Sequence, residues 1–324
     1  MKDANYPSIK EQLTERKGLL HDAVKVSPDN QNLNKLLSDV DAALNEMAEG
    51  TYGICTVCND PIETESLLAD PLMTVCLSHL SDQQQQALED DLEYAGKIQR
   101  AMLPEKEIKT DEWEFAHHYH PAGIVSGDFC DLIPANDGSH IFILGDVSGK
   151  GVSASIMMSN LHALIHSLQS FNLPINEILQ KANRLFCEST LSTNYATIVV
   201  GKVVPDGTVE ICVAGHNPPL IVKDGKVTPI GATGIPVGLF CSAEYDVERF
   251  KLNKNDFLFL YTDGLSEASV NETEYGTDRI KRHLAGLNGL SANEIITDVL
   301  LKQQSFLGNT KLEDDITVAA IRKI

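Results

Sequence analysis

Apolar and polar residues alternate over short stretches in the C-terminal part of the chain, which is the pattern of half-buried β-strands. The predicted strands are residues 113–119, 129–134, 141–147, 195–204, 208–214 and 220–223. Turn residues stand between several of them, at 136–138, 205–207 and 224–225. The Asp-Gly pairs in the last two turns predict β-hairpins.

Apolar residues recur at helical spacing over residues 152–168, 175–191, 277–284 and 292–306. An apolar strand is predicted to follow at 316–321. Strand-rich stretches that alternate with pairs of helices predict an α+β fold and not a doubly wound parallel sheet.

The N-terminal part is helical in pattern. Residues 9–47 form two apolar-striped segments, and Ser27 followed by Pro28 suits the cap and first position of the second helix. We expect a helical hairpin, with a coiled dimerisation arm as the alternative. A further helix is predicted over 81–103, capped by Ser81 and stopped by Pro104. No Pro/Gly/Ser-rich linker interrupts it.

Composition limits the classes of function. The chain has 324 residues, of which 43% are hydrophobic, and a formal net charge of −20. Such a charge disfavours direct binding to nucleic acid or to an anionic membrane. The first residues carry no apolar signal region and no apolar run reaches membrane-spanning length, so a cytoplasmic location is expected. The seven cysteines then indicate a metal site and buried thiols, not disulfides.

Aspartates stand where predicted apolar strands begin or end. Asp146 follows the apolar run 141–144 and precedes a glycine-flanked turn and a helix start. Alone, it could simply cap that turn. Asp128, Asp263 and Asp314–Asp315 repeat the placement, however. Two carboxylates about 4 Å apart repel by roughly 4 kcal/mol at an effective dielectric near 20, so a converged cluster requires cations, and Mg²⁺ or Mn²⁺ prefers such oxygen ligands.

These motifs together resemble the metal-dependent protein phosphatases of the PPM superfamily, and most closely their SpoIIE-like bacterial branch. The resemblance covers residues 96–324 and rests on motifs in the family's order: 127–131 (GDFCD), 145–151 (GDVSGKG), 214–219 (AGHNPP), 261–264 (YTDG) and 314–317 (DDIT). It implies a central antiparallel β-sandwich flanked by helices. Ser126 departs from the branch's usual glycine, and we interpret that position as a backbone one.

The resemblance also implies the roles of the site residues. Asp146 would bridge two Mn²⁺ or Mg²⁺ ions, and Asp128, Asp263 and Asp314 would complete the shells with the Val147 carbonyl. Asp131 and Asp315 would be neighbours of these ligands, with Asp315 a further candidate ligand. The ions would generate hydroxide and neutralise the phosphoryl group of a phosphoserine or phosphothreonine. Ser148 stands where the eukaryotic branch has a histidine.

A second motif lies upstream. Cys55 and Cys58, followed by Cys76 and His79, form two pairs of ligands at the spacing of a tetrahedral Zn²⁺ site. The segment around them resembles the zinc finger of DksA/TraR-type proteins, although His79 replaces that family's usual fourth cysteine. Unlinked thiols or a nonfunctional remnant are the alternatives.

Four segments are therefore predicted: a helical hairpin at 1–48, a zinc finger at 49–80, a linker helix at 81–104 and a phosphatase domain at 105–324. The substrate would be a phosphorylated regulatory protein, such as the anti-sigma-factor antagonists of the SpoIIE-like branch. The N-terminal module would control the activity as a sensor, a homodimer contact or a docking point for a regulatory protein.

Two other classes of function are weighed against this one. A pseudophosphatase is expected to lack one of the metal aspartates, and none is missing. A transcription-linked module would place the DksA-like hairpin and finger on RNA polymerase, for which Asp29 is the only candidate acidic residue at the hairpin tip.

Several other polar residues are interpreted as structural. Alternation along a strand sends His118 to the opposite face from its neighbours His117 and Tyr119, which disfavours a metal cluster in 117–120. His216 is expected to shape the rim of the site. His162 and His166 lie one helical turn apart, but no nearby acidic residue is expected to complete a zinc site. Cys130 is expected to be an inert buried thiol.

Overall fold

The computed structural model describes residues 6–26, 30–80, 82–135, 137–191, 193–271, 273–308, 310 and 312–324. The chain divides into two compact units, residues 1–91 and 92–324. The four predicted segments stay a prediction, because this division falls inside a helix and does not follow their boundaries.

The N-terminal unit contains α1 (Tyr6–Val26), α2 (Gln31–Glu49), α3 (Thr64–Ala69) and the short η1 (Leu77–His79). The helices α1 and α2 pack against each other. The Asn30 side chain accepts hydrogen bonds from the backbone of 32 and 33 and caps α2. Ser27, Pro28 and Asp29, where the hairpin break was predicted, lie outside the described residues.

A small core holds this unit together, and it joins the helices to the cysteine segment. Its buried members are Ile9, Leu13, Val40, Ala43, Tyr52, Cys55, Ile62, Leu67 and Cys76. Leu19 belongs to the first apolar-striped segment but lies outside this core and is 68% exposed.

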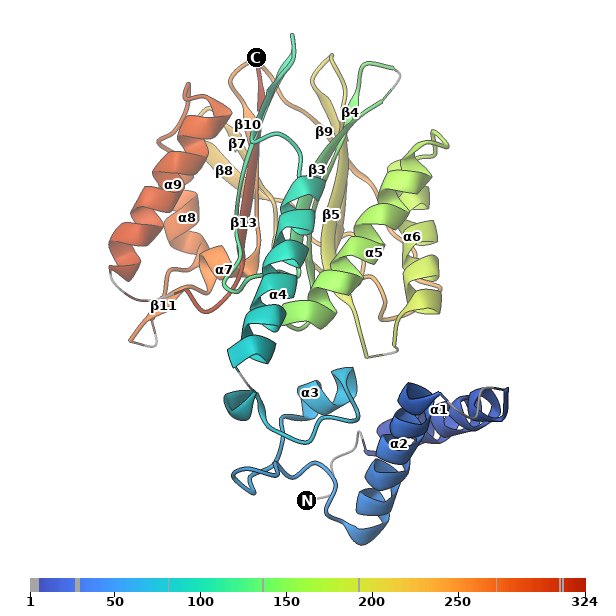
Figure 1. Cartoon of the computed structure of the whole chain (residues 1–324). Coiled ribbons are helices and arrows are strands. Elements are labelled where there is room, and N and C mark those ends of the chain that lie inside the picture. The colour runs from blue at the N-terminus through green and yellow to red at the C-terminus, as the bar shows by residue number, and fades with distance from the viewer. Residues whose placement is uncertain are drawn as a thin grey trace. The chain divides into compact units, whose positions relative to one another are not determined.

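The C-terminal unit is built on two sheets in which every strand pair is antiparallel (Figure 1). The first has the order β1-β2-β13-β10-β7-β8, and the second has the order β3-β4-β5-β6-β9. Their bounds are Glu107–Lys109, Trp113–His120, Ile316–Lys323, Phe257–Tyr261, Leu220–Lys223 and Lys226–Pro229 for the first sheet, and Asp128–Pro134, His140–Val147, Ala196–Val203, Thr208–Ala214 and Glu248–Lys251 for the second. A separate small ribbon pairs β11 (Ser269–Val270) with β12 (Thr273–Glu274).

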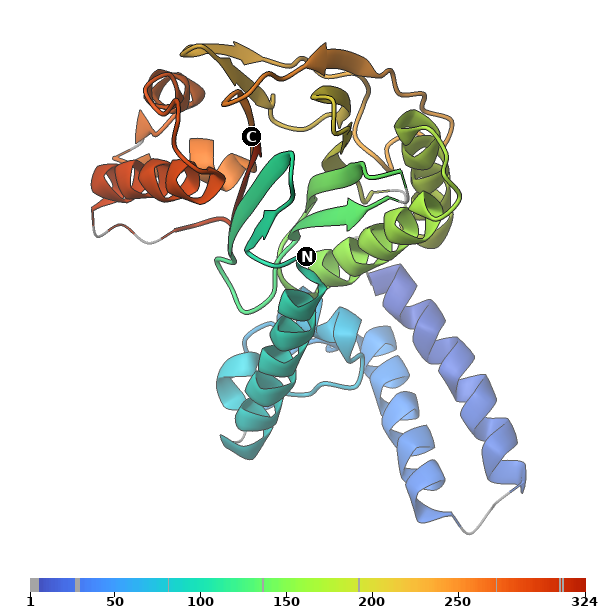
Figure 2. The ribbon, with the colours of Figure 1, turned by 90° about the horizontal axis from the view of Figure 1, so that it is seen from above.

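Helices cover both outer faces of the sandwich, as Figure 2 shows from above. The helices α5 (Gly151–Gln169) and α6 (Ile175–Ser189) share a core with the five-stranded sheet. The six-stranded sheet shares another with α7 (Asp263–Ser266), α8 (Thr277–Leu284) and α9 (Ala292–Leu307). A third core, centred on Phe142 and Leu258, fills the space between the sheets. The predicted α+β class, with an antiparallel sandwich between helices, is confirmed.

The helix α4 (Asp82–Met102) is continuous and crosses the division between the two units. Ser81, its predicted cap, lies outside the described residues. Within the C-terminal unit, Gly96 lies so close to the loop before β3 that an added Cβ would be 2.6 Å from the carbonyl oxygen of Ile124. The last turns of α4 therefore pack against the loop that leads to Asp128.

Candidate active site

The predicted aspartates come together at one end of the sandwich. Asp128 begins β3 and lies directly opposite Asp146 on β4. Asp263 begins α7 immediately after β10, and Asp314 stands just before β13, which pairs with β10. Each aspartate is therefore placed by a strand terminus, and antiparallel pairing brings these termini to the same edge.

Burial and the neighbouring carboxylates raise the pKa values of three of these aspartates. Burial, then the charges of Asp263, Asp314 and Asp315, raise the pKa of Asp146 to about 7. Burial and the charge of Asp314 also raise the pKa of Asp263. Burial and the charge of Asp146 raise the pKa of Asp128 well above its usual range. Carboxylates that repel one another in this way form an oxygen-rich site that favours a bound hard cation.

Asp128 is held rigidly from the facing sheet. Its side chain is only 1% exposed, and one oxygen accepts hydrogen bonds from the hydroxyls of Thr262 at 2.8 Å and Thr317 at 2.7 Å. The threonine hydroxyls come from the end of β10 and from β13. Asp128 thus joins the two sheets at the point where the carboxylates meet.

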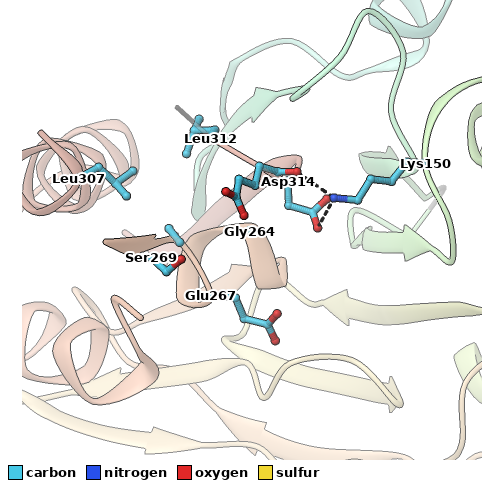
Figure 3. A pocket seen from close by; sticks show the side chains of 9 residues that line it. Lys150, Gly264, Glu267, Ser269, Leu307, Leu312 and Asp314 are labelled. Carbon is cyan, nitrogen blue, oxygen red and sulfur yellow. Dashed lines mark hydrogen bonds and ion pairs between the residues drawn. The ribbon is translucent and has the colours of Figure 1, made fainter. Parts of the chain in front are cut away.

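Lys150 is the cation at this edge. Its ammonium group lies 3.1 Å from a carboxylate oxygen of Asp314 and donates to the Glu313 carbonyl at 2.8 Å. Figure 3 shows Lys150 reaching across to Asp314. Both residues line a cavity of about 140 Å³, together with Gly264 and Glu267. The hydrogen bond to Asp314 raises the pKa of Lys150, so the lysine stays charged beside the carboxylates.

Asp315 anchors the loop before β3. Its two oxygens accept from the backbone N–H of Ala122 at 2.7 Å, from the Ser126 hydroxyl at 2.6 Å and from the Gly127 N–H at 3.2 Å. The Ser126 hydroxyl in turn accepts from the Asp128 N–H at 2.9 Å. Our interpretation of Ser126 as a mere backbone position was therefore wrong, because its side chain links Asp315 to Asp128.

The Val147 carbonyl, predicted as a backbone ligand, lies against Gly127. A Cβ at Gly127 would stand 2.7 Å from the Val147 oxygen and 3.6 Å from a carboxylate oxygen of Asp146. A side chain would therefore displace the carbonyl or crowd Asp146. This close approach is the physical reason for a glycine before Asp128.

The donor set fits a hard divalent cation, since it consists of carboxylate and carbonyl oxygens. The carboxylates nevertheless stand apart. Among the described residues, the groups of three or more ligand atoms within 4.8 Å of one another do not include these aspartates. As the side chains stand, one ion could not take three of the carboxylates directly, so a shell here needs water or side-chain adjustment.

Asp131 lies on the other face of β3 from Asp128. Its carboxylate faces α5, where one oxygen is 2.9 Å from His162 Nε2 and 3.2 Å from His166 Nδ1. Asp131 therefore points away from the other candidate aspartates, and our expectation that no acidic residue lies near the two histidines was wrong. Strand alternation and helix packing place the three together.

The remaining polar residues have structural surroundings. His216 Nε2 donates to the Tyr261 carbonyl at 3.1 Å, and its Nδ1 lies 2.7 Å from the Thr197 hydroxyl. The rings of His118 and His120 are stacked, with their centroids 6.2 Å apart. His117 is buried. Burial raises the pKa of Cys130 well above the usual range of a thiol, which agrees with the expected inert cysteine.

The N-terminal unit brings Cys55, Cys58, Cys76 and His79 together, with their ligand atoms all within 4.8 Å of one another. Cys76 Sγ lies 3.1 Å from His79 Nδ1 and 3.9 Å separates the sulfurs of Cys58 and Cys76. Burial raises the pKa of Cys55, but hydrogen bonds from the backbone of Val57, Cys58 and Cys76 outweigh burial and lower the pKa to about 6. A thiolate is the form that binds metal.

Sequence reasoning missed four residues that support the carboxylates: Gln99, Lys150, Thr262 and Thr317. The Gln99 side chain donates to the Ser126 carbonyl at 2.7 Å and accepts from its N–H at 3.0 Å. Thr262 and Thr317 lie within the motifs 261–264 and 314–317, which was an available signal for their roles. No local pattern indicated that Gln99 would reach a residue 27 positions away.

Comparison with known proteins finds similarity to a phosphatase. The chain is 26% identical over 254 residues to the phosphoserine phosphatase RsbU of Bacillus subtilis, which covers 74% of this chain and 72% of RsbU. It is 25% identical over 264 residues to the protein IcfG of a Synechocystis strain, which covers 71% of this chain but 41% of IcfG. The chain therefore spans less than half the length of that relative.

The fold matches that of the PP2C domain of SiaA from Pseudomonas aeruginosa. The TM-score is 0.64 at 21% identity, and the match covers 74% of this chain and 98% of the SiaA domain. The two-sheet sandwich between helices is therefore a fold that this chain shares with that PP2C domain.

The family model of stage II sporulation protein E (SpoIIE) matches residues 136–323. The chain belongs to the SpoIIE family. Separately, within the described residues, the structure has no helix that is both long and apolar enough to cross a membrane.

Proposed function

We propose that the protein is a metal-dependent phosphatase that hydrolyses phosphoserine or phosphothreonine on a regulatory protein. The carrying observation is the convergence of Asp128, Asp146, Asp263 and Asp314 at one end of the sandwich, where burial and mutual repulsion raise the pKa values of Asp128, Asp146 and Asp263. Membership of the SpoIIE family and the similarity to RsbU support the same activity.

Asp128, Asp146, Asp263 and Asp314, with the Val147 carbonyl and Asp315 as further candidate ligands, would hold two Mn²⁺ or Mg²⁺ ions. When bound, the ions would supply a water-derived nucleophile and neutralise charge on the phosphoryl oxygens. No covalent phosphoenzyme is required, and no nucleophilic side chain is proposed.

The chain's own residues position this chemistry. Thr262 and Thr317 fix one oxygen of Asp128 and leave the other side of the carboxylate available. Asp315 holds the loop 122–127 through three hydrogen bonds, and so sets the position of Gly127 against the Val147 carbonyl. Lys150, which lines the cavity beside Asp314, offers a positive charge to an incoming phosphate.

Substituting Asp146 tests the proposal. Asp146→Asn should lower Mn²⁺-dependent hydrolysis of an aryl phosphate by about 100-fold or more, because the central carboxylate charge is lost. The matched control is Asp224→Asn in the exposed β7–β8 turn, where φ is +48° and asparagine is readily accommodated. Most of the activity persisting in metal-saturated Asp146→Asn protein would rule out the two-ion assignment.

The substrate class follows from the family. RsbU is a phosphoserine phosphatase, and we extend that activity to this chain with an anti-sigma-factor antagonist as the candidate substrate. Comparison of phosphopeptides in cells with and without the gene would identify the substrate. A regulatory protein whose phosphoserine accumulates in the deletion is the expected result.

We also propose that Cys55, Cys58, Cys76 and His79 bind one Zn²⁺ in a DksA/TraR-like finger and that this N-terminal module controls the phosphatase. The four ligand atoms within 4.8 Å of one another support the ion. A unit with so small a core gains stability from metal binding, at about 10–16 kcal/mol for structural zinc. Asp29, on which a role at RNA polymerase would depend, lies outside the described residues.

Removing one thiol tests the finger. Cys55→Ser should lower the zinc content of the purified, reduced protein by about one ion per chain, because a tetrahedral site is left with three ligands. Cys241→Ser, at an exposed free cysteine, is the control and should keep its zinc. Equal zinc content in the two variants would refute the site.

A further inference from the structure

A second cluster of potential metal ligands lies outside both sites described above. It consists of Asp131 on β3 and of His162 and His166 on α5, whose ligand atoms all lie within 4.8 Å of one another. Asp131 and His162 are buried, at 6% and 8% exposure. The side chain of His166 is 54% exposed and opens the cluster to solvent.

The fold separates this cluster from the catalytic carboxylates. Successive side chains of a strand point to opposite faces. Phe129 and Ile133 pack in the core beneath α5 and α6, whereas Leu132 packs between the two sheets. Asp131 has the parity of Phe129 and Ile133, so it faces α5. Asp128 has the opposite parity and faces the interior of the sandwich.

A backbone hydrogen bond orients the carboxylate. One oxygen of Asp131 accepts the Leu132 N–H at 2.8 Å, which leaves the other oxygen for both imidazoles. Metal ligands are usually held in their orientation by such a further hydrogen bond to a neighbouring group.

The geometry points to a binding site for a borderline divalent ion such as Zn²⁺, held by Asp131, His162 and His166. Zn–N and Zn–O bonds of about 2.0–2.2 Å place tetrahedral ligand atoms roughly 3.4 Å apart. The observed separations of 2.9 Å and 3.2 Å, and of no more than 4.8 Å between any two atoms, reach that spacing through small side-chain rotations.

The donor set selects the kind of ion. Two imidazoles and one carboxylate suit Zn²⁺ and its neighbours better than Mg²⁺ or Ca²⁺, which prefer oxygen alone. The group contains three ligands from the described part of the chain, so the fourth position opens to solvent beside His166. A bound ion would pin α5, which follows the Asp146 turn, to β3, which begins at Asp128.

Zinc stoichiometry in the full-length protein tests this site. The protein is loaded with Zn²⁺ in excess Mg²⁺, which occupies the all-oxygen site, and is then dialysed and analysed for metal. The double variant His162→Gln/His166→Gln should hold about one zinc fewer per chain than the unaltered protein. His21→Gln, at an exposed position of α1, should lose none.

Zinc bound by the cysteine cluster is excluded by repeating the comparison in a Cys55→Ser background. In that background the histidine double variant should still hold about one zinc fewer per chain. In the same Cys55→Ser background, Zn²⁺ should raise the midpoint of unfolding. The unfolding is followed by the fluorescence of Trp113, the chain's one tryptophan. His166→Gln should abolish this rise. If the double variant does not fold, His166→Gln alone decides, because His166 is exposed. Equal zinc and equal midpoints would leave only a hydrogen-bonded His-Asp-His cluster and overturn the proposal.

Discussion

At the scale of single residues, His216 shows how burial selects one protonation state. The Tyr261 carbonyl can only accept a hydrogen bond, so Nε2 carries the proton. Nδ1 is then free to accept from the Thr197 hydroxyl. Burial outweighs the favourable hydrogen bonds to Tyr261 and Thr197 and lowers the pKa of His216 to about 4. The ring is therefore a neutral cross-link between strands at neutral pH.

This shift predicts acid sensitivity. Between about pH 6.5 and pH 4 the unfolded chain binds a proton at His216 that the folded chain does not, so stability falls as the pH falls. A difference of about 2.5 pKa units corresponds to roughly 3 kcal/mol. His216→Gln should reduce the slope of unfolding free energy against pH over this window, measured by urea titration of Trp113 fluorescence.

The same titration on His21→Gln controls for the loss of a histidine. That variant should keep the slope of the unaltered protein, since His21 lies exposed on α1. An unchanged slope in His216→Gln would show that other groups carry the acid sensitivity. A lower stability of His216→Gln at pH 7, with a flatter pH dependence, is compatible with the prediction, because the hydrogen bonds are altered as well.

The residues that sequence patterns could indicate were those whose role depends on local position. Asp128, Asp146, Asp263 and Asp314 stand at strand ends, and strand ends are visible as breaks in apolar runs. The partners of Asp131 could not be predicted in this way, because His162 is 31 positions away. Their contact depends on how α5 lies across β3, which the periodicity of neither element contains.

At the scale of elements, hydrophobic periodicity predicted most of the long elements and missed several short strands with few buried residues. The strand Thr208–Ala214 and the helix Thr277–Leu284 have the predicted bounds. The strand β9 was not predicted, and β8 was indicated only by the hairpin turn at 224–225, because the residues of both strands are mostly exposed. A strand this exposed buries too little surface to alternate clearly, whereas the edge strand β3 is almost wholly buried and was predicted.

The contact between α4 and the loop before β3 predicts that α4 affects both the hydrogen exchange of this loop and the turnover of the enzyme. Gln99→Ala removes both hydrogen bonds to the backbone of Ser126. Buried hydrogen bonds of this kind contribute about 1–3 kcal/mol when a partner is left unpaired. We expect faster amide hydrogen exchange over residues 122–128, together with about a tenfold or larger fall in Mn²⁺-dependent turnover.

Gln86→Ala provides the matched control on the same helix. Gln86 is exposed and bonds only to Asp90 within α4, so neither exchange in the loop nor turnover should change. If Gln99→Ala and Gln86→Ala behave alike, the Gln99 contact does not position the carboxylates. If exchange increases and turnover does not change, the loop moves without consequence for catalysis.

At the scale of the whole molecule, two compact units are joined by a single helix. The N-terminal unit has its own core and its own cluster of potential metal ligands, and the C-terminal unit has three cores and the carboxylates. The helix α4 contributes residues to both units and contacts the Ser126 loop through Gln99. A change at the N-terminal unit therefore has a covalent helical route toward Asp128.

We hypothesise that α4 is a lever through which the N-terminal unit sets phosphatase activity. An effector shifts such an equilibrium only by its differential affinity for two states, and typical couplings of about 1–3 kcal/mol correspond to roughly 5–150-fold. A Gly-Gly insertion after Ala87 should change basal turnover or remove its response to an N-terminal ligand, because glycine weakens the helix. An insertion of about four alanines restores nearly a full turn and should disturb turnover less.

The two insertions would be compared in the full-length protein on the phosphoprotein substrate, with Trp113 fluorescence to verify folding. Equal rates in the unaltered protein and both insertions, with and without zinc in the N-terminal unit, would show that α4 connects the units without coupling them.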